Sequence, residues 1–306
     1  MKLITFTRRD DSRERAGVWL AGERVLDLAA AARSNGERQA LSSIVTILRG
    51  GDDAFALLER VSEGAPAAAI VPASEVALLA PIPHPVRNVY CVGRNYLDHV
   101  KEGYQATGRE PELPEVPQFF TKATHAVNAP NGDVRLDPGV TRRFDYEVEL
   151  AVIIGRPGRD IAKEHALGHV FGYAVANDFT ARDLQRRHQQ WFKGKSLDTT
   201  FPFGPWIVDA EEIGDPANLE LSLTVNGEER QRARVSQMIF DIPTLIASLS
   251  AGLTLEAGDI VSTGTPAGVG FAMDPPRYLR GGDIVVSSID RIGTLRNRIV
   301  EVPLRA

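Results

Sequence analysis

The run FDYEVELAVIIG, from Phe144 to Gly155, constrains the fold of this 306-residue chain most strongly, because it places acids inside an apolar segment. Its hydrophobicity predicts a buried strand. Side chains alternate across a strand, so Glu147 and Glu149 point to the same face. Burying two like charges side by side is costly unless a cation neutralises them, and a divalent cation with oxygen ligands is the simplest compensation. The pair therefore predicts half of a metal site.

A third acid, Asp178, follows the apolar run FGYAVA within NDFTARDLQ, where we expect a strand to end and a helix to begin. Three carboxylates without a neighbouring Cys or His favour a hard ion, Mg²⁺ or Mn²⁺, over zinc. The spacing alone leaves an alternative open. Glu147 and Glu149 would then face solvent on an edge strand, and Asp178 would cap a helix.

The composition, with 43% hydrophobic and 25% charged residues, is that of an ordinary soluble enzyme of one or two domains. The net charge of −5 comes from interspersed acids and bases. This pattern does not indicate nucleic-acid or membrane binding and leaves small molecules as the expected ligands. A single cysteine, Cys91, excludes an internal disulfide framework, and the charged N-terminus does not resemble a signal peptide. No run approaches the roughly 18 apolar residues of a membrane span, so we expect a cytoplasmic protein.

A proline-rich bridge, LLAPIPHPVR, predicts a domain boundary. We expect a small N-terminal α+β domain over residues 1–80, with a hairpin and helical segments, and a catalytic domain over residues 81–306. Short β-rich runs dominate the second part, which lacks the strict alternation of strand and helix of a doubly wound fold. The expected fold class is therefore α+β, predominantly β, with mostly antiparallel strands. Asn226 and Gly227 form a two-residue hairpin turn signal.

The segment GRNYLDHVKEG carries His99 and Glu102 three residues apart, which one helical turn places on the same face. A carboxylate that holds an imidazole fixes its tautomer and raises its basicity, so the pair can take a proton from water. The alternative is a surface helix on which His99 is only solvated. The segment from Tyr104 to Gln118 is rich in proline and lacks periodicity, which is consistent with a mobile lid.

Basic residues downstream of Asp178 are candidates to bind an anionic substrate. Lys195 lies in GKS between aromatic and proline-rich runs, a setting that favours a partly buried ammonium able to hold a carboxylate or an oxyanion. Arg182 and Gln185 precede it, although a single Arg is usually only solvated. Thr265 belongs to the Gly-rich turn TGTPAGVG, whose amides and hydroxyl could bind a carboxylate. Further candidates for the pocket wall, each equally explained as packing or surface residues, are Tyr104, Arg109, Trp191 and Phe192.

In this order, the motifs GRNYxxHxxE, FxK with Lys122, DYEVEL, NDFTARDLQ, GKSLDT and TGTPxGVG resemble those of the fumarylacetoacetate hydrolase family, over about residues 87–290. The resemblance implies a mixed β-sandwich roll, usually a homodimer, with Mg²⁺ or Mn²⁺ at its centre. It also implies roles for single residues. Glu147, Glu149 and Asp178 fall on the metal-ligand positions, and His99 and Glu102 fall on the water-activating pair. The positions that contact the substrate are Arg182, Gln185, Lys195 and Thr265.

The resemblance implies 2-oxo acids as substrates, because a 2-oxo carboxylate chelates a divalent ion through a carboxylate oxygen and the ketone oxygen. Our first hypothesis is a metal-dependent hydrolase that cleaves a C–C bond in 2,4-dioxo acids of the acylpyruvate or fumarylpyruvate type, through a metal-bound pyruvate enolate, in catabolism of aromatic compounds or sugar acids. His99 and Glu102 would activate water, and Lys195 would hold the oxyanion. The alternatives are an oxaloacetate decarboxylase or a 2-hydroxy-dienoate isomerase or hydratase. A non-catalytic 2-oxo-acid-binding protein is the least favoured.

Overall fold

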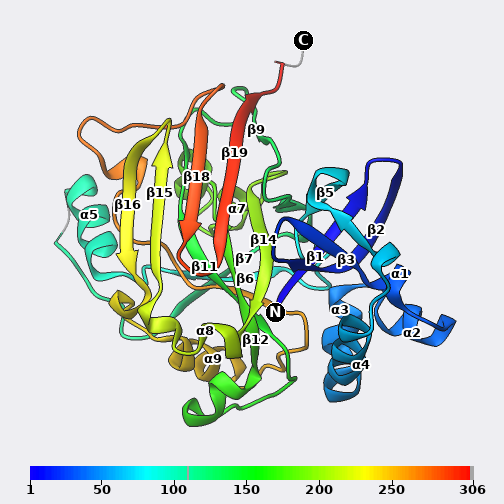
Figure 1. The fold of residues 1–306 in the computed structure, drawn as a ribbon. Coiled ribbons are helices and arrows are strands. Elements are labelled where there is room, and N and C mark those ends of the chain that lie inside the picture. The colour runs from blue at the N-terminus through cyan, green and yellow to red at the C-terminus, as the bar shows by residue number, and fades with distance from the viewer. Residues whose placement is uncertain (109, 304–306) are drawn as a thin grey trace.

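The computed structural model describes residues 1–108 and 110–303, and one long sheet runs through the whole molecule (Figure 1). Within these residues the sheet has twelve strands: β1 (Lys2–Arg8), β2 (Asp11–Leu20), β3 (Arg24–Asp27), β4 (Ile70–Pro72), β5 (Val76–Leu79), β6 (Val89–Gly93), β7 (Gln118–Lys122), β8 (Val127–Asn128), β11 (Val148–Ile154), β12 (Val170–Asn177), β14 (Phe201–Asp209) and β17 (Ile260–Ser262). Hydrogen-bonded neighbours follow the order β4-β3-β2-β1-β14-β12-β11-β17-β6-β7, with β5 on β1 and β8 on β14.

A second sheet of five strands forms a layer in front of β11 and β12 in Figure 1, with four of its strands coloured yellow to red and β9 green. Its strands, in spatial order, are β16 (Glu228–Arg234), β15 (Glu220–Val225), β18 (Ile284–Ile289), β19 (Gly293–Glu301) and β9 (Val134–Leu136). Every second residue of β15 and β18 is buried, which is the period of a strand with one face on a core. A separate pair is formed by β10 (Phe144–Asp145) and β13 (Thr180–Ala181).

The central strand β11 is buried along its whole length because it has a core on each face. Val148 and Leu150 belong to the core beneath the five-stranded sheet, while Ala151 and Ile153 belong to a second core shared with the N-terminal helices. Alternation along the strand places Glu149 on the same face as Ala151 and Ile153. The apolar run in the sequence thus reflects burial on both faces.

Short helices surround the two sheets (Figure 1). Ser43 caps one of them, since its hydroxyl accepts a hydrogen bond from the N–H of Thr46 at the first turn. The helices of the N-terminal part are α1 (Leu28–Ala31), α2 (Asn35–Ala40), α3 (Ile44–Arg49) and α4 (Gly51–Glu63). Those of the remaining chain are α5 (Leu97–Thr107), α6 (Arg182–Arg187), α7 (Phe192–Lys195), α8 (Ala210–Ile213) and α9 (Ile242–Ser250).

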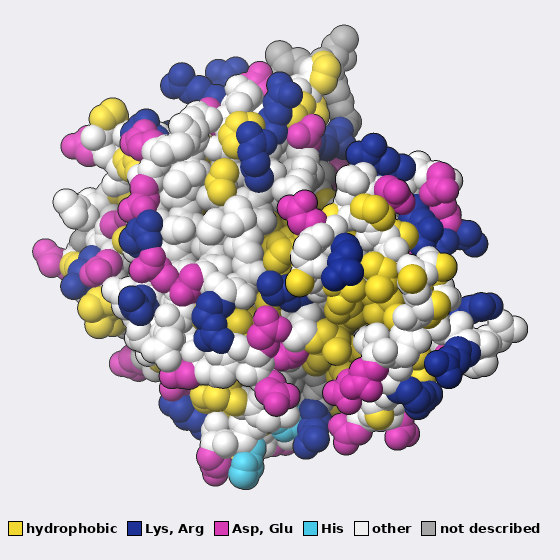
Figure 2. Space-filling model, viewed as in Figure 1, with side chains coloured by type: hydrophobic (Ala, Val, Ile, Leu, Met, Phe, Trp, Pro, Cys, Tyr) yellow, Lys and Arg dark blue, Asp and Glu magenta, His cyan; other side chains and the backbone are white. Residues whose placement is uncertain are grey.

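The N-terminal part is joined to the rest by strand pairing. β1 pairs antiparallel with β14, with Lys2 opposite Val208 and Leu3 opposite Ile207. The predicted hairpin is present as β2 and β3, and the predicted helical segments are α3 and α4. The boundary between residues 80 and 81 stays a prediction, because the long sheet continues across both parts. On the face shown in Figure 2, hydrophobic side chains gather over the N-terminal part, and charges of both signs are mixed elsewhere.

The expected fold class, α+β with a predominance of strands, is confirmed. Among the described strands, the pairs β17–β6, β14–β8 and β19–β9 are parallel and the other pairs are antiparallel. Asn226 and Gly227 form the predicted turn between β15 and β16, with φ of 53° and 82°. Within residues 1–108 and 110–303, no helix combines the length and the apolar character needed to cross a membrane.

Candidate active site

Three carboxylates converge at adjacent ends of β11 and β12. Glu149 is the second residue of β11, Glu147 lies just before that strand, and Asp178 directly follows β12. One oxygen from each acid lies within 4.8 Å of the others, and all three side chains are buried. The solvent-facing alternative is therefore wrong. Asp178 also does not cap a helix, because the N-cap of α6 is Ala181.

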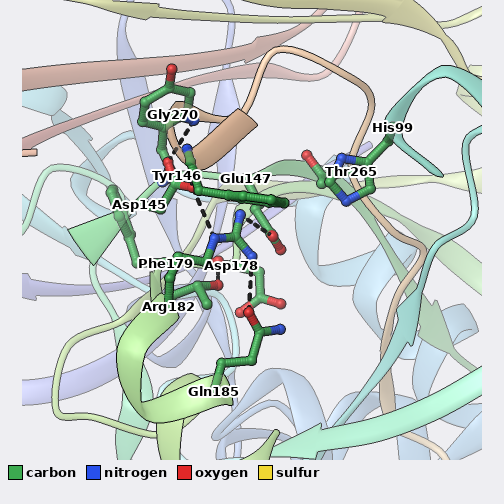
Figure 3. Close-up of polar contacts among 12 residues, drawn as sticks. His99, Asp145, Tyr146, Glu147, Asp178, Phe179, Arg182, Gln185, Thr265 and Gly270 are labelled. Atoms are coloured by element: carbon green, nitrogen blue, oxygen red, sulfur yellow. Dashed lines mark hydrogen bonds and ion pairs between the residues drawn. The ribbon is translucent and has the colours of Figure 1, made fainter. Parts of the chain in front are cut away.

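Three buried cations hold two of these carboxylates. Lys195 Nζ lies 2.6 Å from Glu147 Oε2 and 2.6 Å from Asp178 Oδ2, and it bridges the two acids. Arg182 Nη2 lies 2.7 Å from Glu147 Oε1. Lys122 Nζ donates to Asp178 Oδ1 at 2.7 Å. Figure 3 shows the Arg182 guanidinium between the acids, with His99 and Thr265 on the other side of the site.

The two glutamates have opposite pKa shifts. Burial raises the pKa of Glu147, but the charges of Arg182 and Lys195 outweigh burial and hold it at about 2. Burial, followed by repulsion from Asp178 and Glu147, raises the pKa of Glu149 to about 8. Burial lowers the pKa of Lys195, yet Asp178 and Glu147 raise it above its ordinary value. Glu149 is thus the carboxyl that needs a further positive charge.

One oxygen of the Glu149 carboxylate is available to a ligand. Its Oε2 accepts hydrogen bonds from Ser262 Oγ at 2.5 Å and from the Gly264 N–H at 3.0 Å. Its Oε1 makes no hydrogen bond to any residue in the described ranges. Because Glu149 lines the cavity, a ligand can reach this oxygen, and carboxylate oxygens are the ligands that Mg²⁺ and Mn²⁺ prefer.

The charge balance of the site also fits a divalent cation. Four buried carboxylates surround three buried cations, so the fully ionised site has a net charge of −1. One divalent cation brings this to +1, which favours an anionic ligand. The carboxylates counted here are Asp145, Glu147, Glu149 and Asp178, and the cations are Lys122, Arg182 and Lys195.

Asp145 is a supporting residue beside the three acids. Its Oδ2 accepts from Arg182 Nε at 2.8 Å, and its Oδ1 accepts from the Gly270 N–H at 2.8 Å. The N–H of Phe271 donates to Oδ2 as well, at 3.1 Å. Asp145 therefore ties the loop after β17 to Arg182, and Arg182 in turn reaches Glu147.

His99 and Glu102 form the predicted pair on α5, with His99 Nδ1 2.8 Å from Glu102 Oε1. The Gly268 N–H donates to Glu102 Oε2 at 2.8 Å, and Tyr146 Oη donates to the Gly268 carbonyl at 3.0 Å. His99 Nε2 makes no hydrogen bond within the described residues, so it is available to a ligand. The helix continues to Thr107, which shortens the irregular segment expected from Tyr104 onward. The lid hypothesis stays a prediction.

A cavity of about 510 Å³ connects these groups. It is open to solvent and has the size of a small-molecule site. Of the four candidates for its wall, Tyr104 and Trp191 line it, Phe192 is 46% exposed elsewhere, and Arg109 lies outside the described residues. Site residues on its surface are Arg94, His99, Glu147, Glu149, Arg182, Gln185, Arg186, Lys195, Thr265 and Phe271.

Of the two kinds of donor expected at Thr265, the backbone amide is free and the hydroxyl is not, and Gln185 offers its side-chain amide. The Thr265 hydroxyl donates to the Val148 carbonyl at 2.9 Å and accepts from Gln231 Nε2 at 2.8 Å, so its proton is already used. The Thr265 N–H makes no hydrogen bond to a described residue. Gln185 Oε1 accepts from Arg182 Nη1 at 3.2 Å, which leaves the Gln185 amide nitrogen able to donate into the cavity.

Together, the fold and the site define a two-layer β protein with a buried carboxylate triad beneath a cation-lined cavity. Residues 88–300 match the family described as fumarylacetoacetate (FAA) hydrolase, C-terminal. The chain belongs to the fumarylacetoacetate hydrolase family, as its motifs predicted.

Two relatives named as oxaloacetate tautomerases are similar over most of the chain. YisK of Bacillus subtilis (strain 168) is 45% identical over 290 residues, which make up 92% of this chain and 95% of that protein. The human mitochondrial protein FAHD2A is 41% identical over 233 residues, which make up 76% of this chain and 72% of that protein.

The solved structures that resemble this chain belong to enzymes named for other reactions. A fumarylacetoacetate hydrolase from Exiguobacterium antarcticum has a TM-score of 0.81 and 40% identity, covering 99% of this chain and 100% of that chain. Maleylpyruvate hydrolase of Sphingobium sp. SYK-6, in complex with manganese(II) and pyruvate, has a TM-score of 0.77 and 30% identity, covering 99% and 100%. A 2-hydroxyhepta-2,4-diene-1,7-dioate isomerase from Mycobacterium marinum has a TM-score of 0.73 and 31% identity, covering 98% of each chain. These relatives are enzymes whose reactions differ.

Proposed function

We propose that this chain interconverts the keto and enol forms of oxaloacetate, with Mg²⁺ or Mn²⁺ held by Glu147, Glu149 and Asp178. The observation that carries the proposal is the position of His99, which Glu102 holds on the wall of the cavity that Glu147 and Glu149 line. Support for oxaloacetate as the substrate comes from YisK, the oxaloacetate tautomerase that is 45% identical over 92% of this chain.

The chain's own residues suit a proton transfer at the carbon beside the ketone. Because Glu102 faces His99 Nδ1, His99 Nε2 is free to take the C3 proton, and the Glu102 charge stabilises the imidazolium that results. Lys195 and Arg182 keep positive charge beside the oxygen on which negative charge develops. When bound, Mg²⁺ or Mn²⁺ acts as a Lewis acid on the ketone oxygen.

The carboxylate next to the ketone needs donors, and the cavity provides two. The Thr265 N–H and the Gln185 amide nitrogen are both unused by described residues, and both residues line the cavity. We assign them to the C1 carboxylate of the substrate. The Thr265 hydroxyl serves instead to hold the turn against β11, through the Val148 carbonyl.

A second candidate function is the hydrolysis of a C–C bond in acylpyruvates, by a metal-dependent hydrolase. The observation that favours it is the same pair, because His99 with Glu102 can equally take a proton from water. The maleylpyruvate hydrolase that shares the fold supports this alternative. Decarboxylation of oxaloacetate and isomerisation of a 2-hydroxy-dienoate remain further options, since each passes through an enol of a 2-oxo acid.

The products decide between these reactions. Purified, chelator-stripped protein is loaded with Mn²⁺ or Mg²⁺ and given oxaloacetate, acetylpyruvate and fumarylpyruvate, while ultraviolet absorbance of the enol, pyruvate release and CO₂ release are followed. The proposal predicts faster approach to keto–enol equilibrium of oxaloacetate than in the buffer control, without pyruvate release. Pyruvate from the acylpyruvates alone would establish the hydrolase, and CO₂ from oxaloacetate would establish the decarboxylase. Binding without any turnover would leave a non-catalytic protein.

We also propose that the protein is a homodimer, as the family resemblance implies. Light scattering coupled to size-exclusion chromatography tests this directly, because the chain mass is 33.4 kDa. A mass close to that of one chain at micromolar concentration would contradict it. The cytoplasmic location stays a prediction.

A further inference from the structure

Two arginines on the cavity wall differ from the other cations of the site in their contacts. Arg94 and Arg186 line the cavity, yet neither makes an ion pair or a side-chain hydrogen bond with residues 1–108 or 110–303. The inner cations differ, because Arg182 and Lys195 are both engaged by the buried carboxylates. The unpaired guanidinium groups are therefore the cations that an incoming anion can use without displacing a protein carboxylate.

Arg186 lies on α6, one helical turn after Arg182, so both side chains emerge from the same face of the helix. Both guanidinium groups also lie against the Phe271 ring, with centroid distances of 4.5 Å for Arg182 and 5.5 Å for Arg186. Such cation–π contacts restrict where a long side chain can go. Arg182 reaches inward to Glu147, whereas Arg186 is exposed at the outer part of the cavity.

Arg94 is held by an unusual backbone. Its φ of 55° lies in the left-handed region, which a residue with a β-carbon rarely adopts without a structural reason. Asn95 fixes this turn, because its amide donates to the Thr263 carbonyl at 2.8 Å and to the Phe240 carbonyl at 3.1 Å. The Arg94 guanidinium lies 5.5 Å from the centroid of the Tyr104 ring on α5. The strained residue thus places its charge on the cavity wall beside the helix that carries His99.

We propose that Arg94 and Arg186 bind the substrate carboxylate farthest from the 2-oxo group, and so select 2-oxo dicarboxylates over 2-oxo monocarboxylates. This inference rests on the proposed function. Arginine suits the task, because its planar guanidinium donates two parallel hydrogen bonds to one carboxylate. The inner part of the site takes the carboxylate and ketone at one end of the substrate. The outer arginines then bind the other end of the substrate only when it carries a carboxylate.

A binding experiment on the manganese-loaded protein tests the inference without turnover. The probes are malate and 2-hydroxybutyrate, which have four carbons each and differ in the distal carboxylate, and neither has a ketone to enolise. Calorimetry gives a Kd for each probe with the wild type, Arg94→Gln, Arg186→Gln and the double variant. Arg187→Gln is the matched control, because Arg187 is exposed on the same helix and does not line the cavity.

The inference predicts that malate binds more tightly than 2-hydroxybutyrate to the wild type and to the Arg187 variant. Each of the other single substitutions should weaken malate binding about tenfold, the loss expected for one charge-assisted contact, and leave 2-hydroxybutyrate within about twofold. An unchanged ratio of the two Kd values in the double variant would overturn it, whether the affinities for both probes stay the same or fall equally. Failure of the proposed function is a separate result, because it appears as absent tautomerisation by the wild type.

Discussion

The backbone N–H of Gly268 donates a 2.8 Å hydrogen bond to Glu102 Oε2, and so joins two segments that are 166 residues apart. The other oxygen of the same carboxylate faces His99. The loop after β17 therefore sets the position of the base on α5. Gly268 has a φ of 107°, and a Cβ at this position would lie 1.8 Å from the Arg230 carbonyl oxygen.

Replacing Gly268 with alanine should both destabilise the protein and lower its activity. The positive φ alone costs roughly 1–3 kcal/mol, and the clash with the Arg230 carbonyl adds to this cost by moving the loop away from Glu102. The matched control is Gly227→Ala, because Gly227 also has a positive φ but has no atom within 4 Å of its would-be Cβ. Urea unfolding and kcat check both variants. A kcat of Gly268→Ala equal to that of Gly227→Ala would contradict the link.

The charge of Glu102 is expected to matter more than its hydrogen bond. Glu102→Gln keeps an acceptor for the Gly268 N–H but loses the negative charge that stabilises protonated His99. We expect kcat for oxaloacetate tautomerisation to fall roughly 100-fold, with little change in Tm. Asp98→Asn, on the exposed side of the same helix, should leave kcat unchanged. A Glu102 variant with full activity would remove the pair from the mechanism.

The two glutamates of the triad should respond in opposite ways to neutralisation in the metal-free protein. Glu147→Gln leaves Arg182 and Lys195 with one carboxylate fewer, and breaking a buried ion pair costs roughly 3–5 kcal/mol. Glu149→Gln replaces a carboxyl whose charged form burial and its neighbours already disfavour, so stability should stay equal or rise. Chemical unfolding with a chelator present measures both. Both variants should lose most of their Mn²⁺ affinity, and a Glu149 variant that bound Mn²⁺ normally would exclude it as a ligand.

The raised pKa of Glu149 gives a pH dependence with a definite sign. The pKa is about 8 in the folded metal-free protein and about 4.3 for an unperturbed glutamate, so the folded state holds an extra proton between these values. A state that holds more protons loses stability as pH rises, so this contribution is fully present below about pH 4 and is lost as pH rises from there to about 8. Thermal unfolding of metal-free protein should show the loss, and Glu149→Gln should reduce it. If Glu149→Gln had the same pH profile as the wild type, another group would be the cause of the pH dependence.

The sequence predicted the candidate site where the unusual residues lie close together in the chain. Glu147 and Glu149 within an apolar strand, and His99 with Glu102 on one turn, are each explained by spacing of a few residues. Contacts made by tertiary folding had no such signal. Ser262 reaches Glu149 across 113 residues, and other examples are Lys122 with Asp178 and Gly268 with Glu102.

Whether a segment is a strand or a helix was predictable, because burial sets the spacing of its hydrophobic residues. Which strands pair with each other, and where each strand ends, was not. The break between Asp145 and Val148 removes Glu147 from the strand in which its spacing placed it. The pairing of β1 with β14, which merges the N-terminal strands into the long sheet, depends on a hydrogen-bonding edge that no residue pattern marks. Arg94 and Arg186 were likewise recognisable as a pair only from the shared cavity.

The most direct test of the central claim is exchange of the C3 hydrogens of oxaloacetate with deuterium, followed by NMR in D₂O. The metal-stripped protein, the same protein with Mg²⁺ restored, and His99→Ala with Mg²⁺ are compared with the spontaneous rate in buffer. The account predicts exchange well above the spontaneous rate only for the Mg²⁺-loaded wild type, with the carbon skeleton intact. Exchange at the spontaneous rate in all three samples would contradict it.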